Sequence, residues 1–261
     1  MQRLTQQELK LASESCASKL KGALPEVNYF TTPYRHCVID DFLPADMAQS
    51  CLNSFPSPEA PGWDIANDKD IEIKQRSTWK SEFDIPDGMI DAVRILNGAH
   101  FLQAMTQLIG IQKLVPDPYF SGGGLNITKR GGMLDVHVDG NYHDSSGLNR
   151  RLNAIIYLTP GWLPDWGGEF GVYDKTGEVC VKKIAPLFNR LVVFDSHDYS
   201  FHGLPDPINF PIDIPRRSLL LYYYTKEPRP PEHVSENAPH SALWKRRNLK
   251  DKRGNRTRAY S

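Results

Sequence analysis

Short apolar segments with a period of two fill the second half of this chain and constrain its fold more than any other feature. They begin at Gly123 and are separated by glycine, proline and aspartate, as in Gly131-Gly132 and Pro205-Asp206-Pro207. Alternating apolar residues with such punctuation are typical of β-strands joined by turns. The expected strands are Leu125–Thr128, Met133–His137, Leu152–Leu158, Glu169–Tyr173, Arg190–Phe194 and Ser218–Tyr224. Many short strands of this kind predict a closed or nearly closed double sheet of the jelly-roll type.

The residues before this region have mostly helical spacing. Apolar residues three or four positions apart predict helices over about residues 5–22 and from Ile90 to Leu108. Pro44 is placed to start another helix, after a strand over Tyr34–Leu43. We therefore expect an α+β, mainly β fold, with the helices packed on the outside of the double-stranded β-helix.

The predicted domain boundaries follow from these patterns. A single domain is expected over residues 1–225, with a helical part over about 1–110 and the jelly-roll core over about 122–225. Residues 226–261 are rich in proline and then basic. We predict that they form a solvated, partly ordered extension.

Charge and cysteine content limit the classes of partner. The chain has 31 Lys plus Arg and 31 Asp plus Glu, so its formal net charge is zero and neither nucleic acid nor a membrane is an expected partner. No run approaches the ~18 apolar residues of a membrane helix, and the N-terminus is polar, unlike a signal peptide. The four cysteines stand far apart, which favours reduced, buried thiols over a disulfide framework. We expect a cytoplasmic protein; its oligomeric state is left open.

Two potential metal ligands, His137 and Asp139, stand two positions apart at the end of an expected strand. Side chains at i and i+2 of a strand share one face, about 6.6 Å apart, so both can reach one metal ion. His202 is the expected third ligand, brought in by a second strand. Two imidazoles and one carboxylate on one face, with open positions, are the ligand set of a non-haem Fe(II) oxygenase. His143 and His197 are rival ligands; a turn at the surface is expected for His197, and either a substrate contact or a solvated loop for His143.

An arginine follows the third ligand on an apolar strand. In an oxygenase of this kind the open metal positions accept a 2-oxo acid and O₂, and the far carboxylate of the acid needs a partner in an apolar barrel. A guanidinium suits it, because its planar fork binds a carboxylate bidentately and does not lose its charge. Arg216 is placed to do so, and Ser218 shares its face. Arg217 should point to the opposite face.

The stretch from Gly122 to Thr225 resembles the prolyl 4-hydroxylase-type branch of the Fe(II)/2-oxoglutarate-dependent dioxygenases. The resemblance rests on H-x-D, R-x-x-x-x-x-x-Y-L (Arg150 to Leu158), Trp162 with Gly167-Gly168, P-x-x-N-x-x-V-x-F (Pro186 to Phe194), His202-Gly203 and the R-x-S-L strand. It implies Fe(II) on His137, Asp139 and His202, with 2-oxoglutarate and O₂ as co-substrates and ascorbate as a further cofactor. It also implies that Arg216, Ser218 and Tyr157 hold 2-oxoglutarate. On the strand before H-x-D the family often has a tyrosine, whereas this chain offers Asn126, Thr128, Lys129 and Arg130; of these, Asn126 is the expected contact to 2-oxoglutarate.

By the same resemblance, the chain is expected to hydroxylate an unactivated C–H bond of a prolyl or amino-acid-like substrate, with release of succinate and CO₂. Tyr142, His143, Arg150 and Trp79 are the candidate substrate contacts. Residues 63–83 would form either a mobile flap or an ordinary polar loop and strand. The alternatives are a hydroxylase that tailors a small metabolite, a metal-assisted hydrolase, and an inactive binding module on the same fold.

Overall fold

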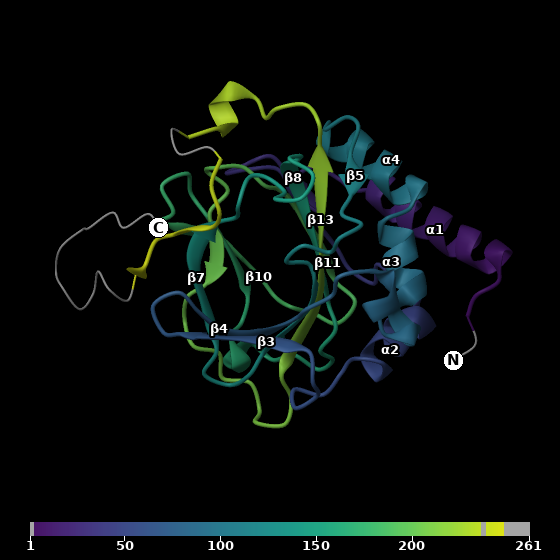
Figure 1. The fold of residues 1–261 in the computed structure, drawn as a ribbon, viewed down its shortest axis with the longest axis horizontal. Coiled ribbons are helices and arrows are strands. Elements are labelled where there is room, and N and C mark those ends of the chain that lie inside the picture. Colours follow the sequence, from purple (N-terminus) through teal and green to yellow (C-terminus); the bar gives the residue numbers. More distant parts are fainter. Residues whose placement is uncertain (1–2, 236–238, 248–261) are drawn as a thin grey trace.

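The computed structural model describes residues 3–235 and 239–247. Four α-helices gather on one side of a strongly curved β-barrel (Figure 1). They are α1 (Gln6–Lys21), α2 (Ala45–Asn53), α3 (Ile90–Leu96) and α4 (Ala99–Ile109). Helix α1 begins at a capping box in which the Thr5 side chain and Glu8 satisfy each other's backbone N–H groups.

The single helix expected from Ile90 to Leu108 is wrong, because the chain forms two helices there. Gly98 separates them with an extended backbone (φ −84°, ψ 161°). A Cβ at this position would lie 2.8 Å from the carbonyl oxygen of Arg94, so the close approach of the two helices depends on glycine. The apolar spacing alone did not show this break.

Fourteen strands form one continuous, antiparallel sheet that closes into the barrel. The strands are β1 (Tyr29–Phe30), β2 (His36–Ile39), β3 (Trp63–Asp68), β4 (Glu72–Ser77), β5 (Val115–Pro116), β6 (Gly124–Thr128), β7 (Met133–Val138), β8 (Asn149–Tyr157), β9 (Phe170–Tyr173), β10 (Cys180–Ile184), β11 (Leu191–Asp195), β12 (His202–Leu204), β13 (Arg216–Thr225) and β14 (Leu243–Trp244). Their main order is β1-β2-β11-β8-β13-β6-β4-β7-β12-β9-β10. The mainly β, jelly-roll prediction is confirmed. All six core strands expected from the sequence are present, with ends shifted by up to three residues.

Strand β13 shows how alternation separates the core from the site. Leu219, Leu221 and Tyr223 face outward and belong to the large apolar core that includes the four helices. Arg216, Ser218 and Tyr222 face inward and line the barrel cavity. The helices therefore hold the outer face of β13 while its inner face is free for chemistry.

Residues 63–83 include a β-hairpin, β3 with β4, followed by a short 3₁₀ turn at Glu82–Asp84. β4 pairs with both β6 and β7 and so joins the barrel wall. Of the two alternatives for this segment, the polar loop and strand agrees better with the structure.

The expectation of a solvated C-terminal extension is wrong for the part that the structure describes. β14 pairs with β7, which places Leu243 beside Val138 and Trp244 beside His137. The pairing buries Leu243, since an apolar side chain gains more from the barrel than from water. The basic residues from Lys250 to Arg258 lie outside the described residues. Within the described ranges, no helix is both long and apolar enough to cross a membrane.

Candidate metal and co-substrate site

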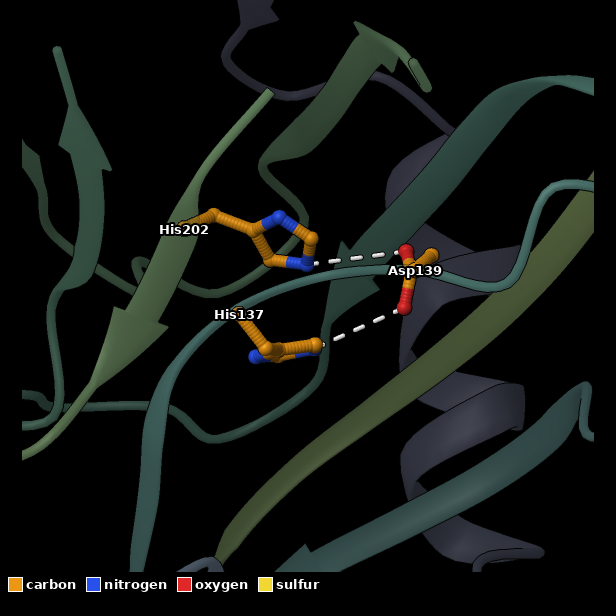
Figure 2. Close-up of side chains that lie close together, drawn as sticks. All are labelled: His137, Asp139 and His202. Atoms are coloured by element: carbon orange, nitrogen blue, oxygen red, sulfur yellow. Dashed lines mark ion pairs between the residues drawn. The ribbon is translucent and has the colours of Figure 1, made fainter. Parts of the chain in front are cut away.

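The three predicted metal ligands converge inside the barrel from β7, from the residue that follows it, and from β12 (Figure 2). His137 Nε2 lies 3.5 Å from Asp139 Oδ1, and His202 Nε2 lies 3.6 Å from Asp139 Oδ2. Direct pairing of His202 with His137 across the two strands brings the imidazoles together, with ring centroids 4.4 Å apart. These three side chains form a compact group that could hold one ion.

Both imidazoles are oriented by the backbone. His137 Nδ1 lies 2.8 Å from the carbonyl oxygen of Asp135, and His202 Nδ1 lies 2.9 Å from that of Ser200. A carbonyl accepts only from a protonated nitrogen, so each ring donates through Nδ1 and turns the Nε2 lone pair toward the site. Burial, followed by the nearby His137, lowers the pKa of His202 to about 4, so its neutral form is available as a ligand at neutral pH.

Asp139 is prepared as an anion. Burial acts to raise its pKa, but the two imidazoles and Arg150 hold that pKa well below the usual range. The amide of Asn153 donates a short hydrogen bond to Asp139 Oδ2. A carboxylate fixed beside two neutral imidazoles matches the donor set of divalent iron.

Asn153 is a functional residue that the sequence analysis missed. It is buried on β8, within the apolar run Leu152–Leu158 and on the same face as Tyr157. An amide inside such a run was the available signal, because a buried polar side chain needs a partner.

We predict that Asn153→Ala lowers the affinity for Fe(II) or Mn(II) by about 10- to 100-fold, the usual effect of losing a side chain that orients a ligand. Metal titration of the chelator-treated protein, followed by calorimetry, measures this. Asn53→Ala, at the exposed end of α2, is the control and should bind metal like the wild type. Equal affinities for both variants would contradict the orienting role.

A buried cavity of about 80 Å³ runs from the three ligands to Arg216. Its wall includes His137, Asp139, His202, Asn126, Asn153, Ser218 and Arg216. Arg216 Nε donates to the carbonyl oxygen of Gly168, 2.8 Å away, which fixes the guanidinium at the cavity end. The Arg217 guanidinium lies instead on the outer face, 5.9 Å from the ring centroid of Phe55.

Asn126, Ser218 and Tyr157 share one row across three neighbouring strands, because Ser218 pairs with the other two. The Arg216 guanidinium carbon lies 4.8 Å from the ring centroid of Tyr157. Both side chains are buried, the Tyr157 hydroxyl interacts with the Arg216 guanidinium, and no carboxylate among the described residues pairs with Arg216. A buried guanidinium without an anionic partner costs free energy unless a ligand pairs with it. The row therefore fits the far carboxylate of a bound 2-oxo acid.

On the other side of the ligands, a pocket of about 870 Å³ opens to the surface; we call it the mouth pocket. All four candidate substrate residues, Tyr142, His143, Arg150 and Trp79, line it, together with His137 and Asp139. Trp79 packs edge-on against Phe120, with centroids 5.6 Å apart, and lies against Gly124.

A bulge in β8 decides which of two adjacent arginines reaches the mouth pocket. Tyr223 pairs with Leu152 but Tyr224 pairs with Arg150, so Arg151 is the extra residue. Arg150 thereby points inward, 3.9 Å from the ring centroid of Tyr222 and 4.0 Å from Asp139 Oδ1. Arg151 is buried.

The rival histidines lie outside the triad. His143 is buried and pairs with Asp117 at 3.0 Å, so it is not a solvated loop residue. The surface role expected for His197 is wrong, because it is buried and stacks on His233 with ring centroids 4.3 Å apart. A second group of potential metal ligands consists of Asp195, His197 and His233.

This second group is a poorer cation site than the triad. Arg35 already donates to the Asp195 carboxylate. The two imidazole planes are within 19° of parallel, so their lone pairs do not converge on one point between the rings. The triad is therefore the better candidate metal site.

Comparisons with known proteins agree with this geometry. Residues 123–224 match the 2OG-Fe(II) oxygenase superfamily. A prolyl 3-hydroxylase of Mus musculus, OGFOD1, is 30% identical over 102 residues, which is 37% of this chain and 18% of that protein. The match thus spans less than a fifth of the relative. The family match likewise covers less than half of this chain, residues 123–224.

Solved structures show the same fold. A prolyl 4-hydroxylase of Pseudomonas putida superposes with a TM-score of 0.57 at 18% identity, covering 82% of this chain and all (100%) of that one. A prolyl hydroxylase of Trichoplax adhaerens, solved with a peptide of hypoxia inducible factor, has a TM-score of 0.57 at 18% identity and covers 85% of this chain and 94% of that one. The chain therefore has the fold of these prolyl hydroxylases.

Proposed function

We propose that this chain hydroxylates a prolyl residue, or a similar amino-acid residue in a peptide, using Fe(II), O₂ and 2-oxoglutarate. The observation that carries the proposal is the position of the triad between two cavities. One is small, is lined mostly by buried residues and ends at Arg216, and the other is the larger mouth pocket. A co-substrate and a substrate can then reach one metal from opposite sides.

The metal, when bound, would couple the oxidative decarboxylation of 2-oxoglutarate to the insertion of one oxygen atom into a C–H bond. The chain's own residues would hold the reactants. His137, Asp139 and His202 would bind the metal, while Arg216, Ser218, Tyr157 and Asn126 would bind the 2-oxoglutarate tail. Phe170 and Phe194, which pack on the His202 ring, keep that side of the site apolar.

Three features support a peptidyl substrate. The mouth pocket is larger than a single amino acid requires and lies within the usual range for ligand sites. Aromatic side chains line it, and their faces suit the apolar ring of proline. Relatives by sequence and by fold are named prolyl hydroxylases. A small metabolite is the alternative that the same pocket allows.

Arg150 is the proposed grip on a substrate carbonyl. It is partly buried against Tyr222, and its only acidic partner among the described residues is Asp139, a proposed metal ligand. Its Nε has no hydrogen-bond partner in the same part of the chain. A cation held in this way is available to a substrate oxygen.

We predict that Arg150→Met raises the substrate KM at least about tenfold, the cost of a lost charge-assisted hydrogen bond. The ratio of succinate to hydroxylated product should also rise, because 2-oxoglutarate is then consumed without a positioned substrate. The KM for 2-oxoglutarate should change little. Unchanged substrate KM and coupling would place recognition elsewhere.

The substrate class is tested by a mass-spectrometric screen for the gain of one oxygen. The screen presents proline-containing peptides, free proline and other free amino acids to the Fe(II)-loaded protein with 2-oxoglutarate. Peptide products support the proposal. Products from free amino acids alone would move the function to the small-metabolite alternative.

We also propose a reducing compartment such as the cytoplasm. All four cysteines are free, and burial raises the pKa of Cys37 and Cys51 to about 12, so both are poor nucleophiles. The need for ascorbate remains a prediction that repeated-turnover assays with and without it can test. Neither nucleic acid nor a membrane is among the proposed partners.

A further inference from the structure

Trp244 lies against a proposed iron ligand although it comes from the C-terminal segment. Its ring stacks on that of His137, with centroids 4.4 Å apart and planes 25° apart. The stacking follows from the pairing of β14 with β7, which places Trp244 directly opposite His137. Residues 239–247 therefore reach the metal site.

The two residues of β14 have different tasks. Leu243 is buried in a small apolar cluster with Val136, Val138, Tyr173 and Phe201, and this contact anchors the strand. Trp244 points to the other face, is only partly buried, and lines the mouth pocket with His240, Ser241 and Ala242. The fold thus does not need Trp244 for its core, and one side of the indole is open to a ligand.

Polar contacts fix the segment in place on both sides of β14. His240 N donates to Asn141 Oδ1, and His240 Nε2 pairs with the buried Asp198 at 3.1 Å. Beyond β14, Lys245 N donates to the carbonyl oxygen of Val136 and Arg247 N donates to Asp135 Oδ2. The position of the indole is therefore set by its flanks and not by the ring itself.

We propose that Trp244 is a specificity-determining residue, and that residues 239–247 form one wall of the substrate site. The open side of the indole would pack on the apolar part of a peptidyl substrate, opposite the Arg150 grip, while its other side rests on His137. The inference rests on the proposed function and adds a residue outside the matched segment, residues 123–224.

The test compares Trp244→Ala and Trp244→Phe in the full chain, with Trp162→Ala as a control. Trp162 is of equal size and lies outside the mouth pocket. The substrate is a prolyl peptide that the wild type hydroxylates. Its KM should rise about 10- to 30-fold in Trp244→Ala, as expected when a central aromatic anchor is truncated, and less in Trp244→Phe. Succinate formed per product should rise, while Mn(II) affinity and the KM for 2-oxoglutarate stay within about twofold. A purely supporting role on His137 would instead weaken Mn(II) binding, and that result would overturn the proposal.

A second readout does not depend on turnover. Decaproline titrated into the Co(II)-loaded protein with 2-oxoglutarate, under anaerobic conditions, should change the tryptophan fluorescence of the wild type and of Trp162→Ala more than that of Trp244→Phe, in which Trp79 still lines the mouth pocket. If the wild type hydroxylates peptides and Trp244→Ala keeps its KM and coupling, the inference fails while the proposed function stands. If the wild type hydroxylates nothing but the Trp244-dependent signal is present, the proposed function fails and the wall remains. If neither signal occurs, both fail.

Discussion

Asp139→Ala is expected to lose both Fe(II) loading and succinate formation, and His137→Ala and His202→Ala are expected to do the same. Each variant removes one of three ligands from a face where the remaining side chains cannot replace it. In Asp139→Ala, two neutral imidazoles would have to hold a dication without a carboxylate, next to the positive charge of Arg150. We expect turnover to fall to the assay background. The measurement is metal content after Fe(II) loading, followed by succinate formation under saturating 2-oxoglutarate.

His100→Ala is the matched control, since His100 is exposed on α4, away from the barrel cavity. It should load iron and form succinate like the wild type. Wild-type turnover in Asp139→Ala would refute the ligand assignment. Thermal unfolding checks that each variant is folded. We expect all of them to be folded, because the substitutions leave the apolar core intact.

Arg216→Ala is expected to raise the KM for 2-oxoglutarate by about 30-fold to several thousandfold. The basis is the cost of removing one partner from a buried, hydrogen-bonded charge pair, about 2–5 kcal/mol. The structure motivates this size of effect, because Arg216 is buried at the cavity end and has no acidic partner among the described residues. The substrate KM should change little, since the mouth pocket lies on the other side of the metal ligands. Succinate formation over a range of 2-oxoglutarate concentrations gives both values.

Arg217→Ala distinguishes the specific contact from a general loss of positive charge. Its guanidinium lies on the outer face of the same strand, near Phe55. It should leave the KM for 2-oxoglutarate within about twofold of the wild type. A larger effect from Arg217→Ala than from Arg216→Ala would show that the inner face of β13 has been wrongly assigned.

The sequence predicted what depends on alternation within one strand. The pairing of His137 with Asp139, the inward position of Arg216 and the core strands all follow from period-two patterns and local spacing. The third ligand comes from another strand, so local spacing does not identify it. His202 was predicted instead from the order of the motifs along the chain. These features repeat along the sequence and are therefore visible in it.

The sequence did not predict what depends on pairing between distant strands or on a local irregularity. The bulge at Arg151 reverses the alternation that would have placed this residue in the mouth pocket, so strand spacing alone would have missed Arg150, which was predicted from the family resemblance. Trp244 stands in a two-residue strand with no periodic pattern, more than 100 residues from its partner His137. His197 was expected in a turn at the surface. It is buried because it stacks on His233, and this contact between segments far apart on the chain is not visible in the local sequence.

Two alternatives raised by the sequence differ from the oxygenase in observable ways. A metal-dependent hydrolase needs no buried carboxylate clamp, whereas Arg216 lies at the end of a small cavity next to the triad. An inactive binding module need not keep a complete ligand set, whereas the three ligands here converge with their lone pairs turned inward. Both alternatives predict that molecular oxygen does not enter a product.

Isotope tracing under ¹⁸O₂ in ordinary water tests the central claim most directly. The Fe(II)-loaded chain is incubated with 2-oxoglutarate and the peptide panel. The masses of the succinate and of the peptide products are then measured by mass spectrometry. We expect one ¹⁸O atom in each succinate and one in each hydroxylated product, and both only when Fe(II) is present. Asp139→Ala should give neither signal. Unconsumed 2-oxoglutarate across the panel, or product oxygen that comes from water, would contradict it.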